Sequence, residues 1–332
     1  MDISRRRFVA AAGCLCLAWG SEALADPNAP PVVAVIDVDT PAARKAFEAF
    51  ATLLDRRFAG RVVRPRAVFI GHEFVQFNHQ INQPNADALR AAVANSHADI
   101  LLASSDGYAQ LLRLLNLGKP ILFFTILDPI ALGLTDSLTR PGLGMSGFAL
   151  GTSSALKRFE MLLRLAPKAR SIGHLSSAGF DREGLLGTAN SPPARETVAI
   201  RRFEFSTPDD LAVTLSSAAA RRMDAWDVSY ASSVFLHSES VVKALGKLRC
   251  PVIYPRMKFI HMGGMAAFEP RLEEADDAWV SQVASLLAGV PMDNIPVVQA
   301  TRYRFGLNLK ACRRVGIEPP KSLIKIADVV LE

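Results

Sequence analysis

Three glycines in the segment RPGLGMSG (140–147) have the spacing of a dinucleotide-binding loop. Gly142, Gly144 and Gly147 follow the pattern G-x-G-x-x-G. In such a loop a strand precedes the first glycine, a helix begins at the last, and an acidic residue follows about 20 residues later. Here Pro141 directly precedes Gly142, the residues FALGTSS separate Gly147 from the next predicted helix, and the following strand ends without Asp or Glu. We therefore interpret the pattern as a glycine-rich turn and expect no dinucleotide, nor any other cofactor.

Catalytic and metal-binding patterns are also missing from the sequence. Ser146 lies in GMSGF, which does not match the G-x-S-x-G motif of serine hydrolases, and there is no G-x-x-x-x-G-K-[ST] loop. We expect a binding protein with no catalytic residue and no metal; an exported α/β hydrolase that pairs Ser146 with a remote histidine is the less favoured alternative. The histidines form neither an H-x-H nor an H-E-x-x-H pair: His72, His79, His97, His174, His237 and His261.

Two serines follow the predicted strand DILLAS (99–104) and precede a helical pattern. Ser104 and Ser105 stand where the carboxyl end of a buried strand meets the N-terminus of a helix. Their hydroxyls and the free N–H groups of the helix suit a ligand carboxylate. Ser105 equally suits the role of an ordinary N-cap, and the two roles are compatible. Asp106 would oppose an anion at this place unless its side chain points away.

Further candidates lie at other predicted strand ends and in irregular segments. Asp128, before Pro129, suits a ligand ammonium group, although capping of its own turn is the commoner role. Glu269 offers a second ammonium partner or a solvated carboxylate. The expected ligand-binding residues are Ser104, Ser105, Asp128, Ser146, Ser177, Ser233, Gly264 and Glu269. Aromatic residues that would either enclose an apolar ligand or belong to the core are Tyr108, Phe148, Phe180 and Phe235.

The elements that must position these residues are short apolar strands that alternate with amphipathic helices. VVAVIDV (32–38) predicts a strand and PAARKAFEAFATLLDRRF (41–58) a helix, and the alternation continues to residue 126. An irregular connection at 128–152 and a second irregular segment at 261–270 interrupt it. Near-continuous apolar strands between helices indicate parallel sheets covered on both faces. We therefore predict an α/β protein with two lobes, whose ligand lies beyond the carboxyl ends of the strands.

The first 25 residues have the pattern of a secretory signal peptide. Arg5 to Arg7 precede a short apolar run that ends at the small-residue stop Ala23-Leu24-Ala25. The run is shorter than the about 20 residues of a membrane span, and SRRRFV resembles a twin-arginine export motif. We expect cleavage near Ala25, export to the periplasm by the twin-arginine or the general route, and no stable membrane insertion.

The composition excludes one class of partner and leaves the cysteines open. The chain has 38 Lys and Arg against 32 Asp and Glu, a net charge of +6 that is spread along its length without a basic block. We therefore expect no nucleic-acid partner. Two cysteines, Cys250 and Cys312, lie beyond the leader; they would either pair or be buried as apolar residues.

Two blocks of sequence resemble the periplasmic substrate-binding proteins of one ABC transporter family, which includes tryptophan- and tyrosine-binding members. The first block is DPIALGLTDSLTRPGLGMSGFA with KRFEMLLRLAPKARSIGHL after it, and the second runs from GGMAAFEP to the end of the chain. The sequence departs from the family pattern at Gly142-Leu143-Gly144, where Gly-Gly-Asn is usual, and at Ala266-Ala267, where a serine-tyrosine pair is usual.

The resemblance implies a type I periplasmic-binding-protein fold, in which two Rossmann-like lobes joined by three crossings close over a small ligand. Residues 32–148 with about 262–296 would form the N-terminal lobe, and 149–261 with about 297–332 the C-terminal lobe. It implies a monomer that delivers an amino acid or related carboxylate to an ABC permease in the inner membrane. A ligand-sensing receptor subunit on the same fold is the alternative.

Overall fold

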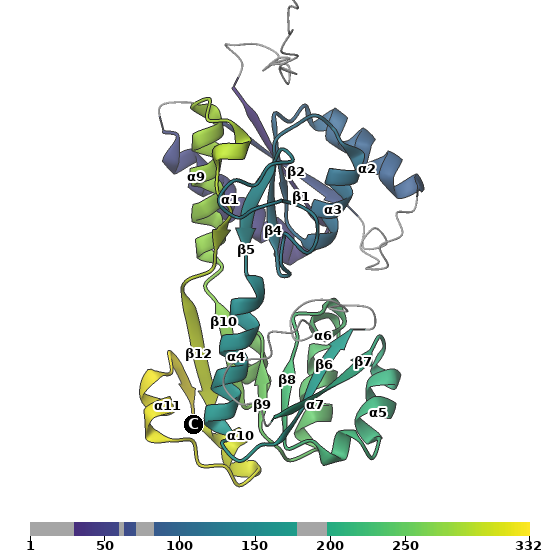
Figure 1. Cartoon of the computed structure of the whole chain (residues 1–332), viewed down its shortest axis with the longest axis vertical. Coiled ribbons are helices and arrows are strands. Elements are labelled where there is room, and N and C mark those ends of the chain that lie inside the picture. Colours follow the sequence, from purple (N-terminus) through teal and green to yellow (C-terminus); the bar gives the residue numbers. More distant parts are fainter. Residues whose placement is uncertain (1–29, 60–62, 71–82, 178–197) are drawn as a thin grey trace, which may run out of the picture.

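The computed structural model describes residues 30–59, 63–70, 83–177 and 198–332. Within them the strands form two separate sheets, one above the other in Figure 1, and helices cover the faces of both. This arrangement confirms the predicted α/β class with mostly parallel sheets. We call the two sheets with their helices the first and the second lobe.

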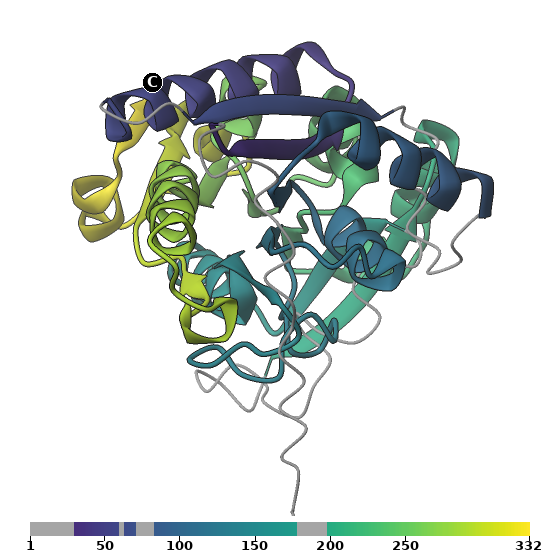
Figure 2. The ribbon, with the colours of Figure 1, turned by 90° about the horizontal axis from the view of Figure 1, so that it is seen from above.

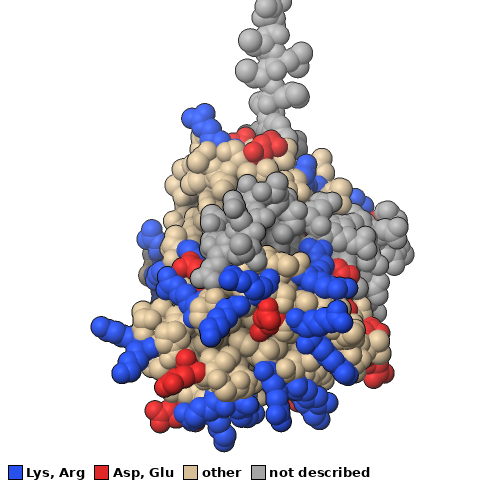
Figure 3. Space-filling model, turned by 60° about the horizontal axis from the view of Figure 1, so that its bottom comes forward, with Lys and Arg blue, Asp and Glu red and all other residues tan. Residues whose placement is uncertain are grey.

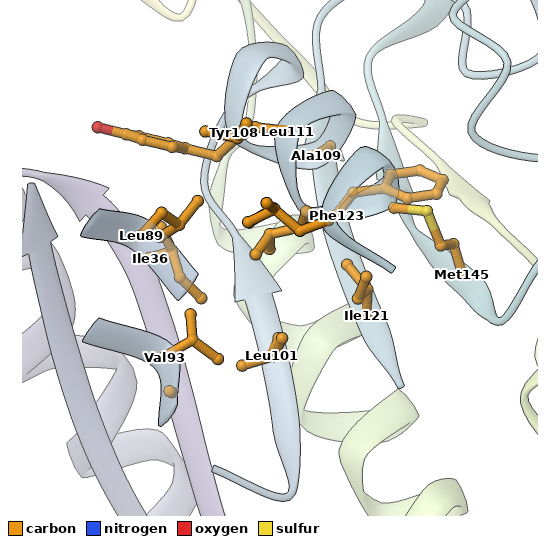
Figure 4. Packing of buried hydrophobic residues seen from close by; sticks show 14 of the residues in the cluster. Ile36, Leu89, Val93, Leu101, Tyr108, Ala109, Leu111, Ile121, Phe123 and Met145 are labelled. Atoms are coloured by element: carbon orange, nitrogen blue, oxygen red, sulfur yellow. The ribbon is translucent and has the colours of Figure 1, made fainter. Parts of the chain in front are cut away.

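The sheet of the first lobe is parallel throughout, with the order β11-β5-β4-β3-β1-β2. Helices α2 and α3 cover one face, where Ile36, Leu89 and Phe123 share a core (Figure 4), and α1 and α9 cover the other. The elements are β1 (Val32–Val38), α1 (Pro41–Arg57), β2 (Arg64–Ile70), α2 (Gln83–Ser96), β3 (Ile100–Ala103), α3 (Asp106–Leu115), β4 (Ile121–Thr125), β5 (Met145–Ala149), α9 (Glu273–Leu287), η3 (Met292–Asn294) and β11 (Val298–Gln299).

The sheet of the second lobe has the order β13-β12-β10-β9-β8-β6-β7, and only the β10–β12 pair is antiparallel. One face packs against α5, α7 and α8, the other against α4, α10 and α11. The elements are α4 (Gly151–Leu165), β6 (Ser171–Ser177), β7 (Ala199–Phe205), α5 (Pro208–Ser216), η2 (Ala220–Arg222), β8 (Ala225–Val228), α6 (Ser232–Leu236), α7 (Ser238–Gly246), β9 (Val252–Tyr254), α8 (Lys258–His261), β10 (Ala266–Pro270), β12 (Tyr303–Asn308), α10 (Leu309–Arg314), α11 (Lys321–Ile326) and β13 (Val329–Leu331).

The chain passes between the lobes three times: from β5 to α4, from β10 to α9, and from β11 to β12. Because β5 leaves the first sheet towards the second lobe and β10 leaves the second sheet towards the first, the carboxyl ends of the parallel strands of both sheets face the boundary between the lobes (Figure 1). Figure 2, seen from above, shows how α9 and α4 lie along one side of the molecule, next to these crossings.

The three crossings are held together by one cluster of side chains. Phe148 and Leu150 come from the first crossing, Ala275 from the start of α9 after the second, and Ala300 from the third. Glu274 adds polar contacts, since its carboxylate accepts hydrogen bonds from the N–H groups of the residues at 301 and 302 (3.0 and 2.9 Å). We call the apolar side chains of this cluster, together with the partly buried side chains packed on them, the hinge cluster; its buried members are Phe148, Leu150, Tyr230, Ala275, Ala278 and Ala300.

Two segments expected to be irregular each contain a strand. Met145–Ala149 forms β5 within the predicted connection 128–152, and Ala266–Pro270 forms β10 within the irregular segment 261–270. Both strands are buried on both faces, so they lack the polar alternation that marks a half-exposed strand. Since β10 belongs to the second sheet and β11 to the first, the second and third crossings lie a few residues later than the sequence suggested.

Gly147, the last glycine of the G-x-G-x-x-G pattern, is needed for the pairing of β5 with β4. Its φ is +152°, and a Cβ at this position would lie 2.1 Å from the carbonyl oxygen of Phe123. The described residues form no dinucleotide loop at this place, because Gly147 lies inside a strand instead of at the start of a helix. The pattern serves the close approach of two strands.

Two further findings concern the membrane and the cysteines. In the described ranges, no helix combines the length and apolar character that crossing a bilayer requires. Cys250 and Cys312 are free thiols, the first partly buried and the second fully buried. Burial raises the pKa of Cys250 to about 12 and that of Cys312 to about 11, so both behave as neutral, apolar side chains.

Candidate functional site

The first lobe places three polar side chains together where β1 and β3 end. Asp37 lies near the end of β1, and burial raises the pKa of its carboxyl group, while the neighbouring hydroxyl of Ser104 and the N–H of Val38 partly oppose that rise. Tyr108, on the first turn of α3, is buried, and burial together with the charge of Asp37 raises its pKa. Among the described residues its hydroxyl has no hydrogen-bond partner, and in Figure 4 it points away from the aliphatic core. Together, the side chains of Asp37, Ser104 and Tyr108 can attract a cation and donate a hydrogen bond to a ligand.

Helix α3 begins at this place with an N-cap and a buried carboxylate. Ser105 caps the helix by accepting a hydrogen bond from the N–H of Tyr108 (3.4 Å). The side chain of Asp106 turns towards the end of β4, where it accepts hydrogen bonds from the N–H groups of Ile126 and Leu127 (3.0 and 3.2 Å). Burial raises the pKa of Asp106 to about 6. Asp106 therefore anchors the helix and is directed into protein instead of towards a ligand.

The second lobe places four serines where β6 and β8 end. The hydroxyl of Ser177 accepts a hydrogen bond from the N–H of Ser233 at the start of α6 (3.0 Å). The hydroxyl of Ser229 donates to that of Ser176 (3.2 Å), and all three side chains of Ser176, Ser177 and Ser229 are buried. The predicted residues Ser177 and Ser233 are thus brought into contact, on the face of the second lobe that looks towards the first.

Apolar and aromatic side chains from both lobes meet between these polar groups. Phe124 stacks on Phe148 with ring centroids 6.0 Å apart in the first lobe, and Tyr230 lies 6.1 Å from Phe235 in the second. All four belong to the hinge cluster, together with Ile126. Phe148 is fully buried there, whereas Phe124, Ile126 and Phe235 keep part of their surface exposed. Phe180, also predicted from the sequence, lies outside the described residues.

A cationic pair lies beside this apolar wall in the second lobe. Arg256 donates a hydrogen bond to Glu269 (2.8 Å), whose carboxylate also accepts one from the N–H of Met257 (2.9 Å). Lys258 lies 4.9 Å from the ring centre of Phe235, and partial burial with the charge of Arg256 lowers its pKa. Glu269 is therefore already neutralised by its own lobe, while Lys258 leaves a positive charge next to the aromatic side chains.

Three predicted residues take no part in the polar and apolar surfaces described above. Asp128 caps its own turn by accepting a hydrogen bond from the N–H of Ile130 (2.8 Å), which is the commoner role weighed for it. Ser146 is fully buried within β5, short of the strand end, and its hydroxyl has no partner among the described residues. Gly264 precedes β10 at the end remote from the first lobe, where a Cβ would meet the ring of Tyr254 at 2.7 Å.

Of the polar side chains at the ends of β1 and β3, only Ser104 is among the ligand-binding residues expected from the sequence. Asp37 lies in the predicted strand 32–38 and is not among the expected ligand-binding residues, although an acidic residue near the end of a buried strand indicates a ligand site. Tyr108 was considered as an aromatic ring instead of as a hydroxyl donor. Lys258 had no signal, because it follows the short strand β9 by several residues. In the part of the chain that the structure describes, no three His, Cys, Asp or Glu side chains gather as metal ligands would.

Comparison with known proteins identifies the family. Residues 72–331 match the model of the ABC transporter substrate binding protein family. A curated relative, a tyrosine-binding protein from Clostridioides difficile, is 22% identical over 235 residues, which cover 70% of this chain and 67% of that protein.

Solved structures with the same fold confirm the architecture. An ABC domain in complex with L-Trp from Streptococcus pneumoniae superposes with a TM-score of 0.73 at 18% identity, over 91% of this chain and 100% of that one. A ligand-free, open substrate binding protein from Clostridium difficile gives a TM-score of 0.64 at 20% identity, over 91% and 99%. A periplasmic binding protein from Burkholderia mallei gives 0.55 at 13% identity, over 81% of each chain. These likenesses confirm the predicted type I periplasmic-binding-protein fold, and the family match covers most of the sequence. The chain belongs to the substrate-binding proteins of ABC transporters, which bind their substrates and are not enzymes.

Proposed function

We propose that this protein captures an amino acid with an aromatic or large apolar side chain between its lobes and delivers it to the permease of an ABC importer. The observation that carries the proposal is the placement of Asp37 near Tyr108, whose buried hydroxyl has no hydrogen-bond partner among the described residues, on one side of a partly exposed apolar wall. The signal-peptide pattern of residues 1–25 supports export, so that the protein would act in the periplasm as a monomer.

Each part of the site suits one part of such a ligand. The carboxylate of Asp37 attracts the ammonium group, and the hydroxyls of Tyr108 and Ser104 add hydrogen bonds. Lys258 and the serines at the ends of β6 and β8 give the second lobe a positive and hydrogen-bonding surface for the carboxylate. The side chain packs on the apolar wall. A ligand that contacts both lobes binds the closed form better and so shifts the population towards it.

Thermal-shift and calorimetric titration of the chain with a graded ligand series tests the proposal. L-Trp, L-Tyr, L-Phe and L-Leu keep both charged groups, whereas tryptamine lacks the carboxylate and indole-3-propionate lacks the ammonium group. We expect an intact amino acid at about 100 times its dissociation constant to add about 2.7 kcal/mol to the stability. We expect both truncated analogues to bind at least about tenfold more weakly, since each leaves a charged group of the site unpaired.

Substitution of a single carboxylate tests whether Asp37 itself binds the ammonium group of the ligand. Asp37→Asn should weaken binding of the amino acid at least about tenfold and leave the affinity for indole-3-propionate almost unchanged, because that ligand has no ammonium group. Asp39→Asn is the matched control, since Asp39 follows the same strand, is exposed and pairs with Arg44 on the surface. Equal loss in both variants, or no saturable binding by any amino acid to the folded wild type, would refute the proposed ligand class.

A further inference from the structure

Basic side chains gather at the end of the second lobe that faces away from the first. Arg170 directly precedes β6, and Arg222 and Arg249 each lie three residues before the strand that follows them, β8 and β9. These three strands are parallel neighbours in the sheet, so the segments before them lie along one edge. Two hydrogen bonds show that the segments before β6 and β8 touch: the hydroxyl of Ser171 donates to the carbonyl of Arg222 (3.2 Å), and the N–H of Arg170 donates to Asp224 (2.9 Å).

Other elements end at the same place and add to the charge. Arg314, at the end of α10, donates a hydrogen bond to the carbonyl of Gly263 in the turn before β10 (2.9 Å). Figure 3, in which this end comes forward, shows lysine and arginine side chains over much of it and few acidic side chains between them. We call this surface the basic end; its exposed members are Arg164, Lys168, Arg170, Arg221, Arg222, Lys247, Arg249, Arg313, Arg314 and Lys321.

Two of the acidic residues nearby, Asp224 and Glu160, already form local contacts. Asp224 accepts hydrogen bonds from the N–H groups of Arg170 and Ser171, which lower its pKa. Glu160 pairs with Arg164 within α4 (2.8 Å). The charge is also unevenly divided over the whole chain: in the described part of the second lobe basic residues outnumber acidic ones roughly two to one, whereas in the first lobe acidic residues are slightly in excess. The molecule is therefore an electrostatic dipole along its long axis.

We propose that the basic end binds the anionic lipid surface of a membrane and holds the protein there with the second lobe towards the bilayer. Clustered lysine and arginine side chains are attracted to anionic headgroups, and each of them adds to the affinity for the membrane surface. The dipole orients the molecule before contact, because the acidic first lobe is repelled by the same surface.

Apolar surface within the basic end favours a lipid over a nucleic acid. Met262, in the turn that Arg314 contacts, is 41% exposed. A surface hollow between the end of α4 and the start of α11 is lined by apolar residues together with the paired Glu160 and Arg164 and the hydroxyl of Ser322; the apolar residues are Leu163, Pro167, Pro320 and Leu323. Basic side chains around apolar ones suit the boundary between headgroups and acyl chains. Among the described residues of the basic end there is no aromatic side chain on which a base would stack.

Vesicle flotation with matched charge variants tests the proposal. The full chain is mixed with vesicles of phosphatidylcholine alone or with added phosphatidylglycerol, at low and high salt. The variant Lys168→Gln/Arg221→Gln/Arg249→Gln/Arg313→Gln neutralises the basic end, and Lys45→Gln/Arg56→Gln/Arg57→Gln/Arg66→Gln removes the same charge from exposed positions of the first lobe. Because residues 1–29 are common to all proteins, any binding by the Arg5–Arg7 cluster is equal in them, and thermal unfolding checks that both variants fold.

We expect binding to the phosphatidylglycerol vesicles only, with a partition coefficient that falls at least about tenfold in the first variant and stays within about twofold in the second. High salt should weaken the binding of the wild type, since exposed charges are screened. Equal loss in both variants, equal binding to neutral vesicles, or absence of binding would overturn the proposal. The proposal would also be overturned if the first variant bound vesicles as the wild type does but lost affinity for a DNA oligonucleotide. The same holds if that variant kept its vesicle binding but no longer self-associated in sedimentation.

Discussion

At the scale of single residues, the absence of a side chain at Gly147 allows β5 to pair closely with β4. A Cβ at this position would lie 2.1 Å from the carbonyl oxygen and 2.5 Å from the nitrogen of Phe123, both of which are backbone atoms that cannot turn away. Gly147→Ala should therefore lower the free energy of unfolding by about 3 kcal/mol or more, as overpacking of a core does. Denaturant unfolding measures the change.

The matched control is Gly246→Ala, at the last residue of α7, where a Cβ meets no atom within 4 Å. This substitution should be neutral or stabilise the protein by up to about 1 kcal/mol, since alanine suits a helix better than glycine. If Gly147→Ala unfolds at the same denaturant concentration as the wild type, the strands do not need the glycine for their approach.

Residue types alone predicted the site only in part, because several polar side chains form hydrogen bonds with neighbouring protein groups instead of facing a ligand. Asp128 and Glu269 have the chemistry of ammonium partners, yet the first caps its own turn and the second binds Arg256 and the N–H of Met257. Ser177 and Ser233 were expected near strand ends, but their contact joins residues that are 56 positions apart in the sequence. Asp37 is a candidate because the fold brings the end of β1 close to Tyr108 on α3.

At the scale of elements, Asp106 fixes α3 to the end of β4 and makes the stability depend on pH. Its pKa is raised by burial from 3.8 to about 6, so between these values the folded state holds a proton that the unfolded state has lost. The contribution of the Asp106 carboxyl group to the free energy of unfolding therefore falls by up to about 3 kcal/mol as the pH rises from about 4 to 6. Asp106→Asn keeps an oxygen that accepts both N–H groups and should make the slope smaller.

Denaturant unfolding at pH 4.5 and 7 tests this prediction. Asp276, whose pKa burial together with Asp277 and Glu273 raises to about 6, adds to the same slope, so Asp106→Asn reduces the pH dependence without abolishing it. Asp55→Asn is the control, because Asp55 is exposed on α1. An unchanged slope in the Asp106 variant would mean that its carboxyl group titrates alike in both states.

Helix α4 is tied to the second sheet by a buried ionic network. Arg158 donates two hydrogen bonds to Asp227 on β8 (2.6 and 3.0 Å), and His174 on β6 lies 2.8 Å from the same carboxylate. Burial opposes the ionisation of Asp227, but Arg158 and His174 outweigh it and lower its pKa. Asp227→Asn should lower the free energy of unfolding by about 3–5 kcal/mol, because it leaves a buried guanidinium without its counter-charge. The double variant Arg158→Met/Asp227→Asn should recover much of the loss, and a double variant no more stable than the single one would contradict this.

The order of elements was largely predictable, whereas the crossings were not. Strands such as Val32–Val38 and Ala199–Phe205 have the same bounds in the structure as in the prediction from the sequence. The strands β5 (MSGFA) and β10 (AAFEP) have small residues, glycine or proline and no alternation, so no local pattern marks them. They form strands because neighbouring strands on both sides supply hydrogen bonds and cover, which is a property of the assembled sheet.

At the scale of the whole molecule, the hinge cluster is where closure over a ligand would be decided. All three crossings meet there, and Glu274 joins the second to the third through hydrogen bonds with the N–H groups of Thr301 and Arg302. Two lobes joined by three short crossings move relative to each other through small changes of backbone angles at those crossings. A ligand held by Asp37 on one lobe and by Lys258 on the other should therefore make the molecule more compact in solution.

Small-angle scattering of the wild type with and without saturating ligand measures this change. We expect a smaller radius of gyration with the amino acid, the same decrease in Asp39→Asn, and a smaller decrease in Asp37→Asn at equal ligand concentration, since only the last variant loses the contact from the first lobe. Glu274→Ala should keep the decrease but lower the free energy of unfolding by about 1–3 kcal/mol, because two N–H groups lose their acceptor. A wild type that binds the ligand tightly in calorimetry yet keeps its radius of gyration would show that capture takes place without closure, and the contacts of the second lobe would then contribute nothing to affinity.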